Sequence, residues 1–109
     1  MKIYISGPIS SLPLHEARDN FARAAAEIKK NGHEPVDPCK LQYILDPETT
    51  SWRQYMRVAL ALLEVCDAAV FLPGWEQSKG AVLERARAQQ YCLHVFERLE
   101  EIMTTGPQE

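Results

Sequence analysis

The feature that most constrains the fold is an uninterrupted apolar run, Ala68-Ala69-Val70-Phe71-Leu72, which ends at Pro73-Gly74. A strand with one face in water alternates apolar and polar residues, whereas a strand covered on both faces is apolar throughout. Strands of the second kind occur in parallel sheets that have helices on both sides. We therefore expect an α/β fold in which 68–72 is a central strand.

Three further runs have the composition of strands, and helical patterns separate them. The strand-like runs cover 2–6, 33–38 and 92–96, and the helical patterns cover about 15–31, 51–65, 78–91 and 97–103. The run 33–38 holds two prolines, which cannot donate to a ladder, so it fits an edge strand. This alternation predicts a doubly wound sheet of about four parallel strands in the order 2-1-3-4. Residues 1–103 should form one domain, and the polar segment 104–109 a poorly ordered tail.

The helical patterns predict which side chains face inward. In the first helix the inward residues recur at spacings of 4, 3 and 4: Ala17, Phe21, Ala24 and Ile28. The second begins with a capping-box pattern, Ser51 to Gln54. Its inward stripe is Trp52, Met56, Ala59, Leu63 and Cys66. The connection 38–50 has turn signals and no clear periodicity, which is typical of a lid or binding loop.

Ligands of doubly wound sheets bind beyond the carboxyl ends of the strands, where the strand order reverses. In the order 2-1-3-4 this crevice lies between the first and third strands. The candidate binding residues there are Ser6, Gly7, Pro8, Ile9 and Ser10 after the first strand, and Gly74 and Trp75 after the third. Asp37, at the end of the second strand, is a further candidate for a contact with a ligand hydroxyl. Trp75 could equally stack on a base or pack against a partner chain.

Glu84 is the candidate catalytic residue. It interrupts a small, apolar helical stripe formed by Ala81, Ala88 and Tyr91. A carboxylate on a buried face is costly unless it is partnered or functional. Two alternatives remain open at this point: a reactive group that reaches into the crevice, or an ion pair with a neighbouring arginine.

Ser78 and Gly80 lie at the predicted start of the third long helix. Backbone amides at a helix N-terminus favour phosphate or carboxylate groups, and a glycine there lets a ligand approach the backbone. The alternative is a serine N-cap followed by an incidental glycine.

Composition excludes several classes of function. The 109 residues carry 12 Lys and Arg against 15 Asp and Glu, a net charge of −3 with both signs scattered, so a nucleic-acid polymer is not an expected partner. No apolar run approaches the roughly 20 residues of a membrane span, and we expect a soluble, cytoplasmic protein with no membrane partner. Three cysteines and three histidines are widely spaced, which predicts free thiols, no metal site and no cofactor.

Five segments carry a specific combination of motifs: 3–10 (IYISGPIS), 32–38 (GHEPVDP), 52–57 (WRQYMR), 66–67 (CD) and 72–84 (LPGWEQSKGAVLE). Together they resemble the nucleoside 2-deoxyribosyltransferase superfamily, and most closely a branch of small bacterial and phage proteins within it. The resemblance extends over about 1–96. It implies a flavodoxin-like sheet that cleaves or transfers the N-glycosidic bond of a 2-deoxyribonucleoside or its 5′-monophosphate.

The resemblance also implies roles for individual residues. In that family a glutamate within a Ser-x-Gly-x-x-x-Glu pattern attacks the anomeric carbon and forms a glycosyl ester, and the pattern falls on Ser78, Gly80 and Glu84. In monophosphate-specific members the serine and the glycine turn hold the phosphate, which implies Ser78 with 7–10. The expected partners are a small nucleoside or nucleotide and, because members are usually dimers or larger, further copies of this chain.

One position departs from the family. Where characterised members carry an aspartate on the second helix, this chain has Ala59. That aspartate assists the nucleophile and proton transfer to the leaving base, and general acid help is typically worth about 10²–10⁴-fold in rate. The alternative function is therefore a nucleotide-binding or sensing protein that has kept the pocket and lost catalysis.

Overall fold

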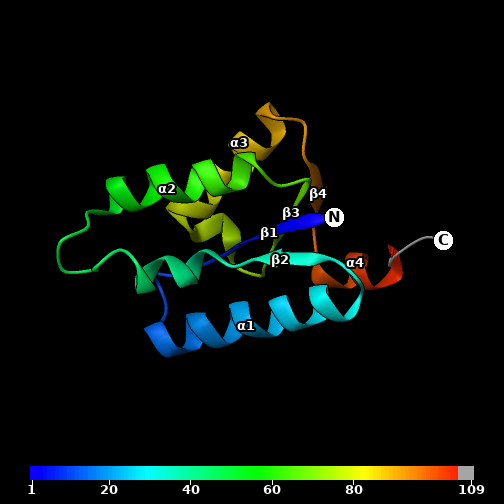
Figure 1. The fold of residues 1–109 in the computed structure, drawn as a ribbon, viewed down its shortest axis with the longest axis horizontal. Helices are drawn as coiled ribbons and strands as arrows, with labels where there is room; N and C mark the ends of the chain where they lie inside the picture. The colour runs from blue at the N-terminus through cyan, green and yellow to red at the C-terminus, as the bar shows by residue number, and fades with distance from the viewer. Residues whose placement is uncertain (106–109) are drawn as a thin grey trace.

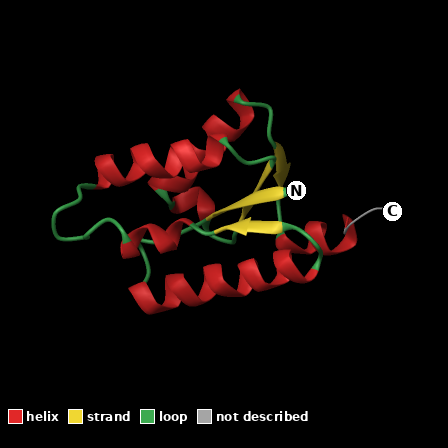
Figure 2. Cartoon of the chain, viewed as in Figure 1, coloured by secondary structure: helices red, strands yellow, loops and turns green. Residues whose placement is uncertain are grey.

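The computed structural model describes residues 1–105 of the chain as a four-stranded sheet between two layers of helices (Figures 1 and 2). The elements in chain order are β1 (Lys2–Ser6), α1 (Leu14–Lys30), β2 (Glu34–Val36), the 3₁₀ helix η1 (Pro38–Tyr43), α2 (Trp52–Glu64), β3 (Ala68–Phe71), the 3₁₀ helix η2 (Trp75–Gln77), α3 (Lys79–Gln90), β4 (His94–Phe96) and α4 (Leu99–Thr105). All strand pairs are parallel and the order is β2-β1-β3-β4, which confirms the predicted fold class and topology.

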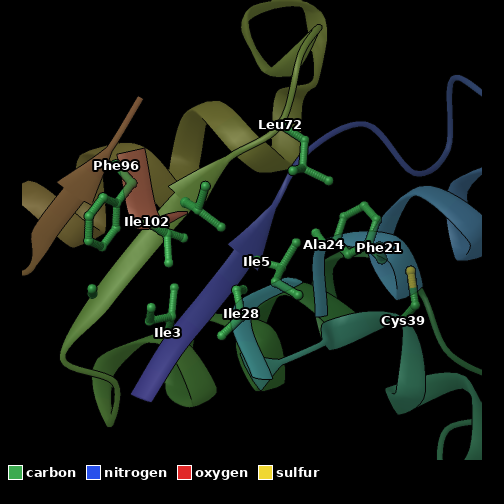
Figure 3. Close-up of a cluster of buried hydrophobic side chains, with 11 residues drawn as sticks. Ile3, Ile5, Phe21, Ala24, Ile28, Cys39, Leu72, Phe96 and Ile102 are labelled. Carbon is green, nitrogen blue, oxygen red and sulfur yellow. The ribbon is translucent and has the colours of Figure 1, made fainter. Parts of the chain in front are cut away.

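The central strand β1 presents different chemistry to each layer. Ile3 and Ile5 pack with Phe21 and Ile28 of α1 in the larger apolar cluster (Figure 3). Tyr4 faces the opposite layer, where α2 and α3 lie. Successive side chains of a strand point to opposite faces, so Ser6 shares the face of Tyr4. The only polar side chains on described strands that are fully buried are therefore aimed at the α2–α3 layer.

The helices bury the faces that their spacing predicts. In α1 the four predicted residues are the buried ones. In α2 the capping box forms, with the Gln54 amide 3.1 Å from Ser51 Oγ and the Ser51 amide 2.9 Å from Gln54 Oε1. Met56, Ala59 and Leu63 are buried. Trp52 is the exception to the predicted stripe, because it is the first residue of α2 and keeps 42% of its surface exposed.

Three segments differ from their predicted structure. The connection after β2 begins with η1, whose first turn forms because the Asp37 carboxylate caps the Cys39 amide at 2.9 Å. β4 begins at His94 and not at the predicted Cys92, because Cys92 has a φ of 58° and belongs to the turn after α3. α4 continues through Thr105, so the first two positions of the predicted tail are helical, and the remainder of that tail, 106–109, lies outside the described residues.

Candidate functional site

A pocket of about 210 Å³ opens at the carboxyl ends of β1 and β3, on the side of the sheet covered by α2 and α3. The turn after β1 forms one wall, the first turns of α2 and α3 form two others, and the connection between β2 and α2 forms the last, through Gln42, Leu45, Pro47 and Thr50. The predicted site residues that border it are Gly7, Ile9, Ser10, Ser78, Gly80 and Glu84. The pocket therefore lies at the switch in strand order, where doubly wound sheets bind their ligands.

Glu84 is buried at the inner end of this pocket, with 6% of its surface exposed. The Tyr4 hydroxyl donates to Glu84 Oε2 at 2.5 Å, and the Ser6 hydroxyl donates to Oε1 at 2.6 Å. Each carboxylate oxygen thus has its own donor from β1. These contacts are possible because the alternation of β1 places Tyr4 and Ser6 on one face, opposite the face of α3 that carries Glu84.

The surroundings of Glu84 bring the pKa of its carboxyl group close to neutral pH. Burial raises the pKa of Glu84 to about 7, and the hydrogen bonds from Ser6 and Tyr4 offset part of that rise. Burial, together with the nearby Glu84 carboxylate, raises the pKa of Tyr4 well above its ordinary value. Tyr4 therefore stays a hydrogen-bond donor, while Glu84 exists in both protonation states at neutral pH.

Within residues 1–105, Glu84 does not form the ion pair with an arginine that the sequence left open. Arg85 pairs with Glu97 at 2.6 Å, and Arg87 pairs with Glu64. Within residues 1–105, the hydrogen bonds of the Glu84 carboxylate come from hydroxyl groups and not from an arginine. A buried carboxylate that lacks a cationic partner and borders a pocket is a strong candidate for a functional group.

The start of α3 combines capping with close packing. Ser78 Oγ accepts a hydrogen bond from the Ala81 amide at 3.2 Å, so Ser78 is the N-cap. A Cβ at Gly80 would lie 3.2 Å from Met56 Sδ, and one at Gly7 would lie 3.0 Å from Leu72 Cβ. Both glycines border the pocket, and both also allow neighbouring elements to approach closely.

Pro8, Gly74 and Trp75 are not brought to Glu84. They border a second hollow, on the side of α1 and the start of α4. The Trp75 ring is packed edge-on against Phe71, with centroids 5.5 Å apart, and the Arg85 guanidinium lies 4.7 Å from the Trp75 ring centroid. Asp37 does not border the pocket either, because its carboxylate caps η1. Burial raises the pKa of Asp37.

The pocket contains aromatic residues that sequence reasoning did not assign to it. Trp52 and Tyr55, from the first turn of α2, border it together with Gln42 of η1. The Tyr55 hydroxyl donates to the Pro38 carbonyl at 3.0 Å, which ties α2 to η1. Tyr4 was also missed as a site residue. The signal that finds it is the alternation Tyr4, Ser6 in a strand that is otherwise apolar.

Ala59 is fully buried in α2, which confirms that position 59 faces inward. It follows Tyr55 and Met56, which border the pocket, by one helical turn, but its own methyl group does not border the pocket.

Among residues 1–105 there is no cluster of three or more His, Cys, Asp or Glu side chains that could hold a metal ion. No helix in that range is long and apolar enough to cross a membrane. Cys39, Cys66 and Cys92 are free thiols.

Fold and site together define a flavodoxin-like α/β domain with a buried glutamate in the crevice at the switch in strand order. The sequence matches the family described as "Domain of unknown function (DUF4406)" over residues 1–97, and the chain belongs to that family.

Among solved structures, the fold is similar to that of a 2-desoxiribosyltransferase from Leishmania mexicana, with a TM-score of 0.61 and 22% identity. The alignment covers 86% of this chain and 61% of that chain, so this chain spans less than two thirds of its length. The likeness agrees, at the level of the fold, with the resemblance seen in the sequence. A search of curated proteins gave no match.

Proposed function

We propose that this protein cleaves or transfers the N-glycosidic bond of a 2-deoxyribonucleoside or its 5′-monophosphate, with Glu84 as the nucleophile. The observation that carries the proposal is the position of Glu84. Its carboxylate is buried, borders the pocket and accepts hydrogen bonds from Tyr4 and Ser6. The fold likeness to a 2-desoxiribosyltransferase supports the same class of chemistry.

The proposed reaction has two steps. An ionised Glu84 oxygen attacks the anomeric carbon and forms a glycosyl ester, while the bond to the base nitrogen breaks and the base leaves with the electron pair and gains a proton from solvent. Water then attacks the anomeric carbon, which releases the sugar with a hydroxyl group and restores the carboxylate. In the transfer reaction the nitrogen of a second base takes the place of water. Two displacements at one carbon retain its configuration.

The two hydrogen bonds to Glu84 support this role. Each hydroxyl fixes one carboxylate oxygen, so the nucleophile is held before the substrate arrives. The same donors stabilise the ionised form, which is the form that attacks. Because the pKa of Glu84 is about 7, the rate should rise with pH through neutrality.

The direct test is base release from a panel of deoxynucleosides and their 5′-monophosphates, followed by chromatography. Wild-type protein should release base from at least one member, and Glu84→Gln should reduce the rate by a factor of about 10³ or more. The glutamine side chain keeps the size of the native residue and one of the two oxygens that accept hydrogen bonds from Tyr4 and Ser6. Lack of release by wild type at high protein concentration, or equal rates for the two proteins, would rule out the proposed reaction.

A second candidate function is nucleotide binding or sensing without turnover. The observation that favours it is Ala59, a buried methyl group where the resemblance predicts an aspartate. Under this alternative, nucleotides raise the melting temperature of the protein and no base is released. A panel in which no nucleoside or nucleotide changes the melting temperature would exclude binding, and with it both candidates.

We also propose that the chain assembles as a homodimer or higher homo-oligomer. Four exposed apolar side chains on α2 and α3 support this proposal: Trp52, Val58, Val82 and Leu83. Light scattering coupled to size exclusion should give a mass at least twice that of one chain. A monomeric mass at micromolar concentration would overturn it.

A further inference from the structure

The residue that follows Glu84 joins α3 to two other parts of the fold. The Arg85 guanidinium donates to both carboxylate oxygens of Glu97, at 2.8 and 2.6 Å, and Glu97 comes directly after β4. The same guanidinium lies 5.2 Å from the centroid of the Phe71 ring and 4.7 Å from that of the Trp75 ring. Two parallel hydrogen bonds and two aromatic contacts fix the direction of this side chain better than a single contact would.

Phe71 connects this side chain to the strand that holds Glu84. Phe71 is the last residue of β3 and lies opposite Ser6 in the register of β1 and β3. The next amide, that of Leu72, donates to the Ser6 carbonyl at 2.8 Å. The Ser6 hydroxyl in turn donates to Glu84. Arg85 and Glu84 are therefore held at neighbouring positions of one sheet.

The two side chains together set the rotation of α3 about its own axis. Consecutive residues of a helix point about 100° apart around that axis. Glu84 is held by β1, while Arg85 is held by the end of β3 and by the residue after β4. The rotation that satisfies both decides where the Glu84 carboxylate lies. Arg85 and Glu97 are described residues that do not border the pocket, so a ligand there does not contact them.

We propose that Arg85, held by Glu97, is a positioning residue that keeps the Glu84 carboxylate at the inner end of the pocket. Its effect on the rate of the reaction rests on the proposed function, whereas its effect on the position of Glu84 does not. The pair is partly exposed, with 19% of the Arg85 side chain and 53% of the Glu97 side chain accessible to solvent, so its loss should leave the protein folded.

The pKa of Glu84 reports the position of its carboxylate. Burial raises that pKa to about 7, and it acts more strongly than the hydrogen bonds that lower it. A carboxylate that moves toward water loses the larger influence, so its pKa should fall toward 4.5. Loss of a nearby positive charge alone would act in the opposite direction and raise the pKa. The sign of the change therefore separates a change of position from a change of charge.

The other titratable groups that act on Glu84 or are affected by it stay neutral in such a titration. They are Tyr4 of β1, Cys39 of η1 and Tyr55 of α2. Burial raises the pKa of each of them, and together with nearby Asp37 it raises that of Cys39 to about 12. Of these four groups, Glu84 is the one that titrates between about pH 4 and 9.

The test follows the carbon-13 NMR shift of the Glu84 carboxyl carbon against pH, with the signal assigned by its absence in Glu84→Gln. The variants are Arg85→Met, which keeps a long side chain without the charge, and Glu97→Ala, which removes its partner. Arg87→Met and Glu64→Ala are the matched controls, because Arg87 lies on the same helix and forms an ion pair with Glu64 of α2.

In Arg85→Met and in Glu97→Ala the pKa of Glu84 should fall from about 7 to about 6 or lower, and both control variants should leave it at about 7. If Glu84 is the nucleophile, Arg85→Met should also lower kcat about threefold to tenfold and leave KM unchanged, because a displaced carboxylate attacks less effectively.

An unchanged or raised pKa in Arg85→Met or in Glu97→Ala would overturn the positioning role, and so would an equal fall in either control variant. A lower pKa with unchanged kcat would contradict the role of Arg85 in the reaction. Absence of base release by wild type is a separate result. It would remove the proposed function, and the titration would still decide whether Arg85 holds Glu84 in place.

Discussion

The Tyr4 hydroxyl donates a 2.5 Å hydrogen bond to Glu84 Oε2, and so joins the first strand to the third helix across 80 positions of sequence. Both groups are buried. The bond holds the carboxylate at the inner end of the pocket and lowers its proton affinity relative to burial alone. Ser6 does the same for the other oxygen.

Tyr4→Phe removes one donor and leaves the aromatic ring in place. The ionised form of Glu84 then loses a hydrogen bond, so its pKa should rise above about 7 and the pH at which activity appears should move upward. The free energy of unfolding should fall by about 1–2 kcal/mol. A pH–rate profile and a denaturant titration measure the two effects. Tyr55→Phe, which removes a hydroxyl bonded to Pro38, is the control and should leave the profile in place.

Glu84 makes the stability of the protein depend on pH. Its pKa is about 7 in the folded state and 4.5 as an ordinary glutamate, so the folded state binds the extra proton between these values. The contribution to stability is fully present below pH 4.5 and is lost as pH rises through 7. From pH 5 to pH 8, the free energy of unfolding of wild type should fall by about 2–3 kcal/mol relative to that of Glu84→Gln. Urea titrations of both proteins at each pH measure this difference, and parallel curves would contradict the assignment.

Ala59→Asp separates the two candidate functions. The site is fully buried, so the new carboxyl group should cost about 2–4 kcal/mol of stability. Ala59→Asn has nearly the same shape without the acid and serves as the control. If the pocket retains catalysis, the aspartate variant should release base at least about tenfold faster than the asparagine variant. Equal rates in the two variants would mean that an acid at position 59 gives no help to the leaving base.

Gly7→Ala tests whether this glycine is required by packing. The new Cβ would lie 3.0 Å from Leu72 Cβ, a contact between two short, inflexible parts of the chain at the ends of β1 and β3. Relief requires a shift of the backbone, so we expect a loss of about 1–3 kcal/mol, seen as a lower melting temperature. Unchanged stability would show that the loop after β1 adapts, and that the glycine serves the pocket instead.

The layers of the fold follow from the sequence because they depend on local periodicity. The apolar run ending at Leu72 predicted a strand covered on both faces, and the spacing from Ala17 to Ile28 predicted the buried face of α1. Ser51 and Ser78 predicted where α2 and α3 begin. Each of these predictions needs only the residues of one element.

The residues that line the pocket could not all be predicted from the sequence in the same way. Trp75 was predicted to share the crevice with Glu84, yet Gly74 packs close to Pro8, where a Cβ would lie 3.2 Å from Pro8 Cγ. Beyond this contact, the Trp75 ring packs edge-on against Phe71 and lies next to the Arg85 guanidinium of α3, and Trp75 does not border the pocket. Where a loop side chain packs depends on contacts between distant segments, and spacing within one loop does not contain them. The aromatic wall is instead supplied by Trp52.

The measurement that tests the central claim most directly is mass spectrometry of the protein after acid quenching during turnover of an active deoxynucleotide. The account predicts a peptide containing Glu84 that is heavier by one deoxyribosyl group, or its 5′-phosphate, and predicts no such mass in Glu84→Gln. Base release by wild type with every peptide unmodified, or with the sugar attached to a different residue, would contradict Glu84 as the nucleophile.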